Sequence, residues 1–280
     1  PESIGYDFQV QWLESRCIGC NTCLETCTHG ALSRVLEGIQ RDRERCVVCG
    51  DCARECPAGA MEYLGREVSV DELFNELLKD YAYYEKSGGG VTLSGGEPSL
   101  QPNFAAALLR RLRNAGVHTA VDTCGMCAFN SLERLLPHTD LLLYDLKEMD
   151  AARHERFTGQ SNRIILNNLL RLSELIASDY PQVSLWVRTP LIPGRTARAE
   201  NIAAIGAFLG EHLAGRVARW ELCAFNNLCA DKYARLDMDW PFAGVALLTQ
   251  AELDAYEAWA RDSGVDPEIV IASGAVQAPV

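Results

Sequence analysis

Eight cysteines near the start of the chain repeat one spacing twice, C-x2-C-x2-C-x3-C, where x is any residue. The first copy consists of Cys17, Cys20, Cys23 and Cys27, and the second of Cys46, Cys49, Cys52 and Cys56. This spacing is typical of proteins that hold two [4Fe-4S] clusters, where the fourth cysteine of each copy binds the other copy's cluster. The sequence therefore predicts two ligand sets, Cys17, Cys20, Cys23 and Cys56 for one cluster, and Cys46, Cys49, Cys52 and Cys27 for the second.

The two copies lie 29 residues apart and agree beyond their cysteines. Gly30-Ala31 matches Gly59-Ala60, which indicates an internal duplication. Zinc and disulfides are the alternative interpretations, but zinc sites rarely show this tandem spacing, and disulfides require an oxidising compartment. Thiolates that hold clusters instead predict a reducing, anaerobic cytoplasm. Four further cysteines are interpreted as buried or half-buried thiols, namely Cys124, Cys127, Cys223 and Cys229.

Composition narrows the class of protein. The chain has 280 residues, of which 48% are hydrophobic. We expect no membrane segment, because no apolar run approaches the roughly 20 residues that cross a bilayer. The formal net charge of −12 argues against nucleic acid as a partner. The chain opens at Pro1-Glu2-Ser3 without an initiator methionine or a signal segment, so we expect it to begin within a longer protein.

Beyond the cysteines, predicted strands alternate with predicted helices. Short apolar and β-branched runs predict strands over Val91–Leu93, His118–Val121, Leu141–Tyr144, Val183–Val187, Arg219–Cys223 and Pro267–Ile271. Apolar residues at helical spacing predict helices over Val70–Gly88, Asn103–Gly116 and Thr249–Gly264. This alternation indicates a parallel sheet, and about six strands are too few for a closed barrel of eight βα repeats. The expected fold class is α/β, an incomplete (β/α) barrel with an N-terminal two-cluster ferredoxin-like α+β domain.

We expect three parts along the chain. Residues 1–13 are interpreted as the remnant of an upstream segment, residues 14–65 as the two-cluster domain, and residues 66–280 as the partial barrel.

Polar or glycine-rich residues follow each strand, where the loops of a parallel α/β fold converge on the active site. They are Ser94, Gly95, Gly96, Glu97, Asp122, Asp145, Lys147, Arg188 and Asn226. Gly95 and Gly96 have no Cβ and would let a ligand approach the backbone closely, and Glu97 offers a carboxylate to an ammonium group. Glycine pairs are also common in tight turns without any ligand. Alternation places Asp145 and Lys147 on one face, where they would form a site or simply an ion pair. The guanidinium of Arg188 is suited to bind a carboxylate. The alternative is structural, since a loop rich in proline can serve simply to end a strand.

Together these motifs resemble the activating enzymes of glycyl radical enzymes, members of the radical S-adenosylmethionine (SAM) superfamily. From Pro1 to about Ile271, the resemblance is carried by the tandem cysteines, Ser94-Gly95-Gly96-Glu97-Pro98, Asp122-Thr123-Cys124-Gly125, Tyr144-Asp145-Leu146-Lys147, Arg188 with Ile192-Pro193-Gly194, and Asp231-Lys232-Tyr233. It implies a third [4Fe-4S] cluster, held by C-x3-C-x2-C, at which SAM is cleaved by one-electron reduction. The radical so formed takes a hydrogen from a glycine of a partner glycyl radical enzyme. Flavodoxin or ferredoxin would donate the electron.

The resemblance also implies roles for single residues. The SAM-binding set would be Ser94, Gly95, Gly96, Glu97, Asp122, Asp145, Leu146, Lys147 and Asn226. Within this set, Gly95, Gly96 and Glu97 would lie at the methionyl ammonium, Asp145 and Lys147 at the methionyl end, and Asp122 near the ribose. Arg188 would bind a substrate peptide or the SAM carboxylate. In relatives, residues at the positions of Asp122, Thr123 and Asp145 can also hold a monovalent cation.

Two features depart from the family pattern. The chain contains no C-x3-C-x2-C, so it supplies no cysteines for the catalytic cluster; we expect that loop upstream of Pro1 and expect this chain to be inactive alone. Asn226 stands where some relatives carry histidine, and it can donate a hydrogen bond but cannot titrate. Two alternatives from other classes are an iron–sulfur electron-transfer module without radical catalysis and an inactive scaffold that binds a partner.

Overall fold

The computed structural model describes residues 7–36, 38–236 and 238–278 of the chain, which divide into two compact units. The first unit extends to Glu67 and also includes Asn227–Gly244. The second unit consists of Val68–Asn226 and the chain from Val245 onward. None of the helices within these ranges is long and apolar enough to cross a membrane.

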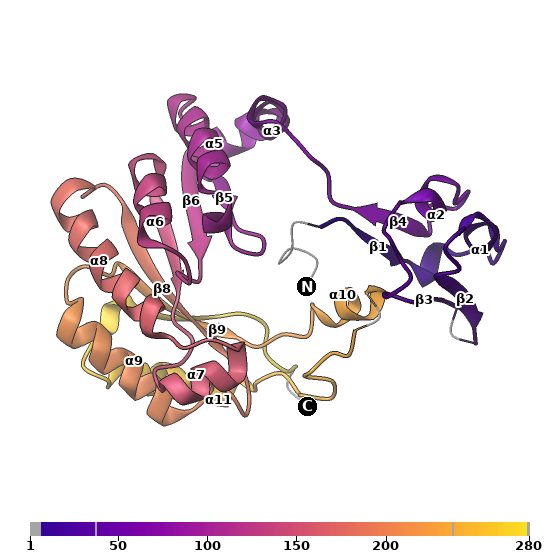
Figure 1. Cartoon of the computed structure of the whole chain (residues 1–280). Coiled ribbons are helices and arrows are strands. Elements are labelled where there is room, and N and C mark those ends of the chain that lie inside the picture. The colour runs from indigo at the N-terminus through magenta and orange to yellow at the C-terminus, as the bar shows by residue number, and fades with distance from the viewer. Residues whose placement is uncertain (1–6, 37, 237, 279–280) are drawn as a thin grey trace. The chain divides into compact units, whose positions relative to one another are not determined.

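The first unit is built from short strands and helices (Figure 1). Its strands are β1 (Gln9–Trp12), β2 (Leu32–Val35), β3 (Gly38–Arg41) and β4 (Met61–Leu64), and its helices are α1 (Thr22–Thr26), α2 (Asp51–Arg54) and α10 (Ala230–Arg235). β1 pairs antiparallel with β4, and β2 with β3. Val10 of β1 packs in one core cluster with Cys23 and Cys52. The expected boundary at residue 13 therefore separates β1 from the strand with which it pairs.

The span expected to form the partial barrel, residues 66–280, also differs from the structure. Its segment Asn227–Gly244 groups with the first unit. Residues 1–6 of the expected remnant lie outside the described residues.

The internal duplication is visible in the backbone of the first unit. Three equivalent pairs of residues have positive φ in both copies: Gly19 and Val48 (72° and 54°), Asn21 and Gly50 (66° and 78°), and Gly30 and Gly59 (58° and 58°). Val48 is the unusual member, because β-branched residues rarely adopt the left-handed region. The chain thus follows the same turns around the cysteines in both copies.

The second unit contains a six-stranded sheet in which every neighbouring pair is parallel. The strands are β5 (Gly90–Leu93), β6 (His118–Thr123), β7 (Leu141–Asp145), β8 (Ser184–Leu191), β9 (Arg219–Ala224) and β10 (Val270–Ser273). They lie side by side in chain order from β5 to β10. The prediction of about six parallel strands in an incomplete barrel is confirmed.

Helices precede and follow the strands, and several of them lie along one face of this sheet (Figure 1). They are α3 (Val70–Leu77), α4 (Tyr81–Ser87), α5 (Pro102–Asn114), α6 (Phe129–Leu135), α7 (Ala151–Thr158), α8 (Arg163–Asp179), α9 (Ala199–His212) and α11 (Gln250–Arg261). Capping boxes start α3 at Ser69 and α11 at Thr249. Side chains alternate in burial along β8: Leu185 and Val187 are buried in the main core, while Arg188 is only half-buried on the other face.

Strand β8 is longer than predicted, because Arg188 to Leu191 continue it. A proline inside a parallel sheet normally costs a ladder hydrogen bond. Here β7 ends at Asp145, opposite Arg188, so the missing N–H of Pro190 breaks no bond with β7. Arg188 therefore lies within a strand and not at its end.

Two other predicted boundaries were wrong. The helix expected over Val70–Gly88 is divided by a 3₁₀ turn at Leu78–Asp80, and Leu77, Leu78 and Tyr84 still pack against one cluster. The closing strand starts at Val270, because Pro267–Ile269 form a 3₁₀ turn. Asp266 caps that turn by accepting a hydrogen bond from the Glu268 N–H, at 3.0 Å.

Candidate functional site

The eight tandem cysteines line two pockets in the first unit. One pocket is lined by Cys17, Cys20, Cys23 and Cys56, and the other by Cys27, Cys46, Cys49 and Cys52. The empty space within them is similar, about 330 and 360 Å³. Each pocket takes three cysteines from one copy and one from the other, which is the grouping predicted for two clusters. That these cysteines ligate iron stays a prediction.

The fourth cysteine of each copy accepts a backbone hydrogen bond. The Ala31 N–H donates to Cys27 Sγ at 3.4 Å, and the Ala60 N–H donates to Cys56 Sγ at 3.3 Å. Hydrogen bonds of this kind favour the thiolate and tune the reduction potential of a cluster. The two cysteines that are predicted to cross between copies are therefore held in the same way.

The electrostatics of the pockets fit a cluster. Burial raises the pKa of the Cys23 thiol, and it raises that of Cys52 to about 11, so these thiolates need a nearby positive charge. Within the described ranges, no three His, Cys, Asp or Glu side chains are placed to hold a single metal ion. Zinc requires its sulfur ligands about 2.3 Å from one centre, whereas the thiolates of a cubane bind different irons.

In the second unit, three charged residues form a row across neighbouring strands. Asp145 of β7 pairs in register with Arg188 of β8, which pairs with Glu221 of β9. Arg188 Nη1 lies 3.0 Å from Asp122 Oδ2, and Arg188 Nε lies 3.6 Å from Glu221 Oε2. Burial opposes the charge of Arg188, but Asp122 and the nearby thiol of Cys223 raise its pKa above the usual value. Arg188 is thus already engaged by carboxylates of the protein.

The Nε donor of Arg188 faces Glu221 but makes no hydrogen bond to it. This nitrogen is buried and makes no hydrogen bond within the described part of the chain. Glu221 Oε2, at 3.6 Å, neutralises this donor but is too far away for a hydrogen bond, and a buried donor without a hydrogen bond is costly. A ligand oxygen close to Nε would supply the missing acceptor.

The predicted pair of Asp145 and Lys147 is present. Lys147 Nζ lies 3.2 Å from Asp145 Oδ2, and Leu146 between them is buried. The alternation predicted from the sequence is confirmed. Burial raises the pKa of Asp145, while Lys147 acts in the opposite direction.

The Glu97 carboxylate joins the loop after β5 to the end of β6. It accepts hydrogen bonds from the Ser99 N–H at 3.1 Å, the Thr123 hydroxyl at 2.7 Å and the Cys124 N–H at 2.9 Å. A carboxylate offers about four acceptor positions, so about one is left for an ammonium group.

The other predicted site residues lie in the loops at this end of the sheet. The Ser94 hydroxyl donates to Asp122 Oδ2 at 3.2 Å. Gly95 has φ of 111°, and among the residues that the structure describes, its chain neighbours apart, no atom lies within 4 Å of the position that a Cβ would take. Gly96 follows it on the surface, and Asn226 is exposed just after β9.

The three residues considered for a monovalent cation have other partners. Asp122 contacts Arg188, Asp145 contacts Lys147, and the Thr123 hydroxyl donates to Glu97. Their side chains are therefore directed to three different groups.

Sequence reasoning missed Glu221 at this site. A signal was available, since Glu221 is a charged residue between the buried Trp220 and Leu222 in a strand. Cys223, two residues further along the same face, is half-buried, and burial raises the pKa of its thiol.

The remaining thiols largely follow the prediction. Cys124 and Cys127 are half-buried as expected, and burial raises the pKa of Cys124 to about 11. Cys229 is exposed, so the prediction of burial was wrong for it. It lies at the start of α10 and not in a strand of the sheet.

Comparison with known proteins identifies two families along the chain. The sequence profile of the radical SAM superfamily matches residues 43–204, and that of the 4Fe-4S dicluster domain matches residues 16–60. The isethionate sulfite-lyase activating enzyme of Nitratidesulfovibrio vulgaris is 38% identical over 94% of this chain and 85% of its own length. The trans-4-hydroxy-L-proline dehydratase activating enzyme of Clostridioides difficile is 44% identical over 72% of this chain and 65% of its own.

A solved domain of pyruvate-formate lyase-activating enzyme from Bacteroides vulgatus superposes with a TM-score of 0.51 at 27% identity, covering 66% of this chain and 99% of that domain. The matched profiles imply SAM and [4Fe-4S] clusters as cofactors. They favour radical chemistry over the electron-carrier alternative. The chain belongs to the radical SAM activating enzymes of glycyl radical enzymes.

Proposed function

We propose that this protein activates a glycyl radical lyase or dehydratase in the cytoplasm. Its relatives activate isethionate sulfite-lyase and trans-4-hydroxy-L-proline dehydratase, and an enzyme of that kind is the proposed partner. The observation that carries the proposal is the row of Asp145, Arg188 and Glu221, with Lys147 beside it, which runs across β7, β8 and β9 at the level of the carboxyl end of β7. Ligands of open α/β sheets bind at this end.

The charges at the strand ends suit the methionyl part of SAM, which carries an ammonium, a carboxylate and a sulfonium group. Glu97 would accept a hydrogen bond from the ammonium, and Arg188 Nε would donate to the carboxylate. Lys147 and Asp145 would lie at the same end of the ligand, and Asp122 with Ser94 would lie near the ribose. The open side of Gly95 and the exposed Asn226 would leave room for the ligand.

When bound, a reduced [4Fe-4S] cluster would supply the electron for cleavage of SAM, and hydrogen would then be taken from a glycine of the partner. We propose that the two cysteine pockets relay this electron from flavodoxin or ferredoxin. If the first unit had only a structural role, it would not need two sites for a redox-active metal.

The SAM site is tested by Lys147→Ala and Asp145→Ala in the enzyme with its catalytic cluster loaded. Both changes leave a charge without its partner beside the ligand, so both should reduce formation of 5′-deoxyadenosine from SAM. Lys79→Ala, a change in the 3₁₀ turn Leu78–Asp80 far along the chain from the strand ends, is the matched control. Wild-type formation of 5′-deoxyadenosine in both variants would contradict the assignment.

The relay is tested separately by Cys46→Ser. Turnover supported by flavodoxin should fall, while the dissociation constant of SAM should stay unchanged, because no strand-end residue is altered. Equal loss of SAM binding would indicate a structural role for the pocket. The identity of the partner is tested by affinity capture with the glycyl radical enzymes of the same organism.

A further inference from the structure

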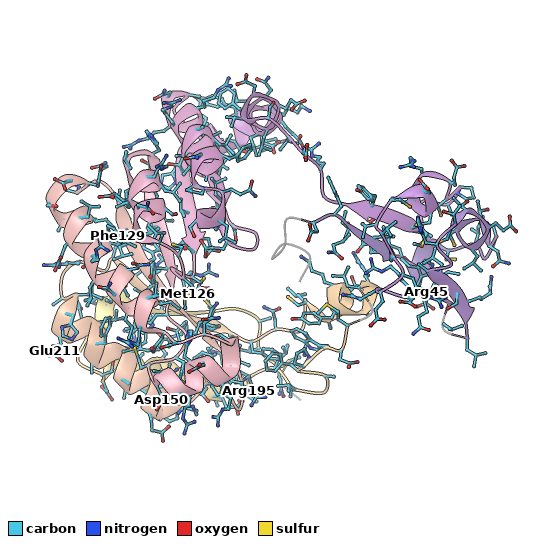
Figure 2. The ribbon with its side chains drawn as sticks, in the orientation of Figure 1. Arg45, Met126, Phe129, Asp150, Arg195 and Glu211 are labelled. Atoms are coloured by element: carbon cyan, nitrogen blue, oxygen red, sulfur yellow. The ribbon has the colours of Figure 1, made fainter. Side chains whose placement is uncertain are left out.

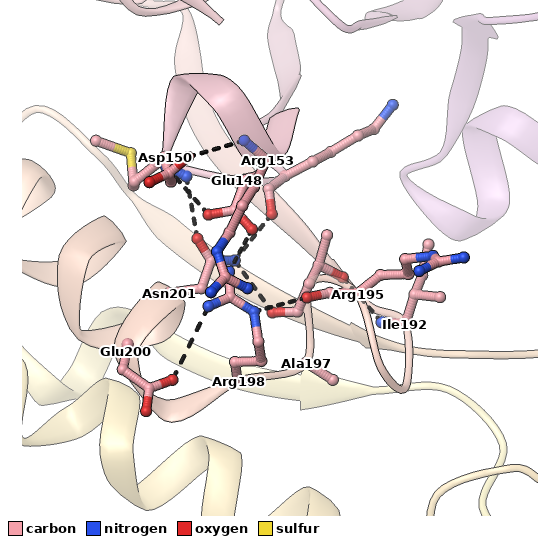
Figure 3. Close-up of polar contacts among 12 residues, drawn as sticks. Glu148, Asp150, Arg153, Ile192, Arg195, Ala197, Arg198, Glu200 and Asn201 are labelled. Atoms are coloured by element: carbon pink, nitrogen blue, oxygen red, sulfur yellow. Dashed lines mark hydrogen bonds and ion pairs between the residues drawn. The ribbon is translucent and has the colours of Figure 1, made fainter. Parts of the chain in front are cut away.

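An ion pair with a buried carboxylate lies in the loop after β7, next along the chain to Lys147. Glu148, in the loop after β7, is only 2% exposed, and its carboxylate accepts a hydrogen bond from Arg198 Nη2. Arg198 directly precedes α9 and also donates through Nε to the Arg195 carbonyl at 2.8 Å. The second carboxylate oxygen of Glu148 accepts the Asp150 N–H at 3.1 Å. Figure 3 shows these residues gathered around the two charges.

Asn201, on the first turn of α9, holds the backbone on both sides of Glu148. Its Oδ1 accepts the Met149 N–H at 3.0 Å, and its Nδ2 donates to the Lys147 carbonyl at 3.0 Å. The same Nδ2 donates to the Thr196 carbonyl at 3.0 Å. The side-chain amide therefore ties the loop after β7 to the loop after β8, from which Asp150 and Arg195 are labelled in Figure 2.

The burial pattern links this network to Lys147. Leu146 and Glu148 are buried while Asp145 and Lys147 are half-buried, so side chains alternate beyond the end of β7. Because Glu148 is held inward by Arg198, the neighbouring Lys147 has to point to the opposite face, beside Asp145. Without Arg198, Glu148 would be a buried carboxylate without a counter-charge, and turning it to solvent would turn Lys147 away.

We propose that Arg198 and Asn201 are positioning residues for Lys147, acting through Glu148 and the loop backbone. The inference rests on the proposed function only in assigning Lys147 to the SAM site. The arrangement of the loop can be tested without SAM.

The test is competitive acylation of lysine amines in the holoenzyme, followed by mass spectrometry. The chain has four lysines, and Lys79 and Lys86 serve as internal references in each sample. Arg198→Gln and Asn201→Ala should each raise the labelling rate of Lys147 severalfold relative to these references. The double change Glu148→Gln with Arg198→Gln removes the buried charge and should return the rate to near the wild-type value.

Arg113→Gln is the matched control. Arg113 Nε lies 3.5 Å from Asp140 Oδ1, just before the first residue of β7 and so at the opposite end of the same strand. This variant should lower stability without changing the labelling of Lys147. An unchanged Lys147 rate in both Arg198→Gln and Asn201→Ala, or an equal rise in Arg113→Gln, would overturn the positioning role.

The same experiment separates this inference from the SAM assignment. If Lys147 lies in the SAM site, SAM protects it from acylation in the wild-type enzyme. An effect of Arg198→Gln without protection by SAM would support the positioning role and refute the SAM assignment.

Discussion

The grouping of cysteines across the two copies can be tested by counting iron in double variants. Cys17 and Cys56 line one pocket although they are 39 residues apart, whereas Cys27 belongs to the other pocket. Two cubanes hold about eight irons. Cys17→Ala with Cys56→Ala removes two ligands of the same cluster, so about four irons should remain. Cys17→Ala with Cys27→Ala removes one ligand from each cluster and should leave both labile.

The measurement is the iron content of anaerobically reconstituted protein, with loss of iron during gel filtration as the readout of lability. The two double variants differ only in which second cysteine is replaced, so differences in expression or general damage are controlled. Cys124→Ala, outside both pockets, should keep about eight irons. If each copy instead held its own cluster, the two results would be exchanged: Cys17→Ala with Cys27→Ala would keep about four irons. That exchange would refute the crossed assignment.

Two further predictions concern packing and thiol reactivity. Gly50→Ala should destabilise the first unit by about 2 to 4 kcal/mol, through left-handed strain and overpacking, because a Cβ would lie 2.8 Å from Tyr63 Cδ2. At Gly59 an added Cβ would meet open space, so Gly59→Ala has similar backbone strain without the overpacking and should cost only about 1 kcal/mol. The urea concentration at which half of the cluster absorbance is lost measures the stability of both variants. Equal shifts of this midpoint in the two variants would contradict the packing argument. In alkylation at pH 8, exposed Cys229 should react first among the four cysteines outside the two pockets. Because the pKa of Cys124 is about 11, its alkylation rate should rise about tenfold for each pH unit below that value. An alkylation rate of Cys124 that does not change with pH would contradict this prediction.

Local patterns in the sequence predicted much of the structure. The cysteine spacing indicated the two pockets, because the ligands of each cluster lie within a few residues or at equivalent positions of a repeat. The capping residue Ser69 located the start of α3, and alternation placed Asp145 and Lys147 together. Each of these features depends on neighbours along the chain.

Features that depend on contacts between distant segments were not predicted. Glu221 joins the site only because β8 and β9 pair in a register that places it opposite Arg188. The extension of β8 through Pro190 is possible only because β7 stops earlier. The pairing of Gln9–Trp12 with β4 likewise depends on a strand about 50 residues away, outside the reach of local periodicity.

The exchange of Cys27 and Cys56 between pockets also affects how damage spreads. The first unit has a small core, in which Cys23 and Cys52 themselves are two of the five buried members. Small domains of this kind depend on cross-links for stability, and each cluster would join one copy to the other. Oxygen that destroys either cluster would therefore remove a cross-link from both halves at once. Loss of one cluster would loosen the whole first unit, so enzyme molecules that had lost a cluster would be cut by proteases faster than intact ones.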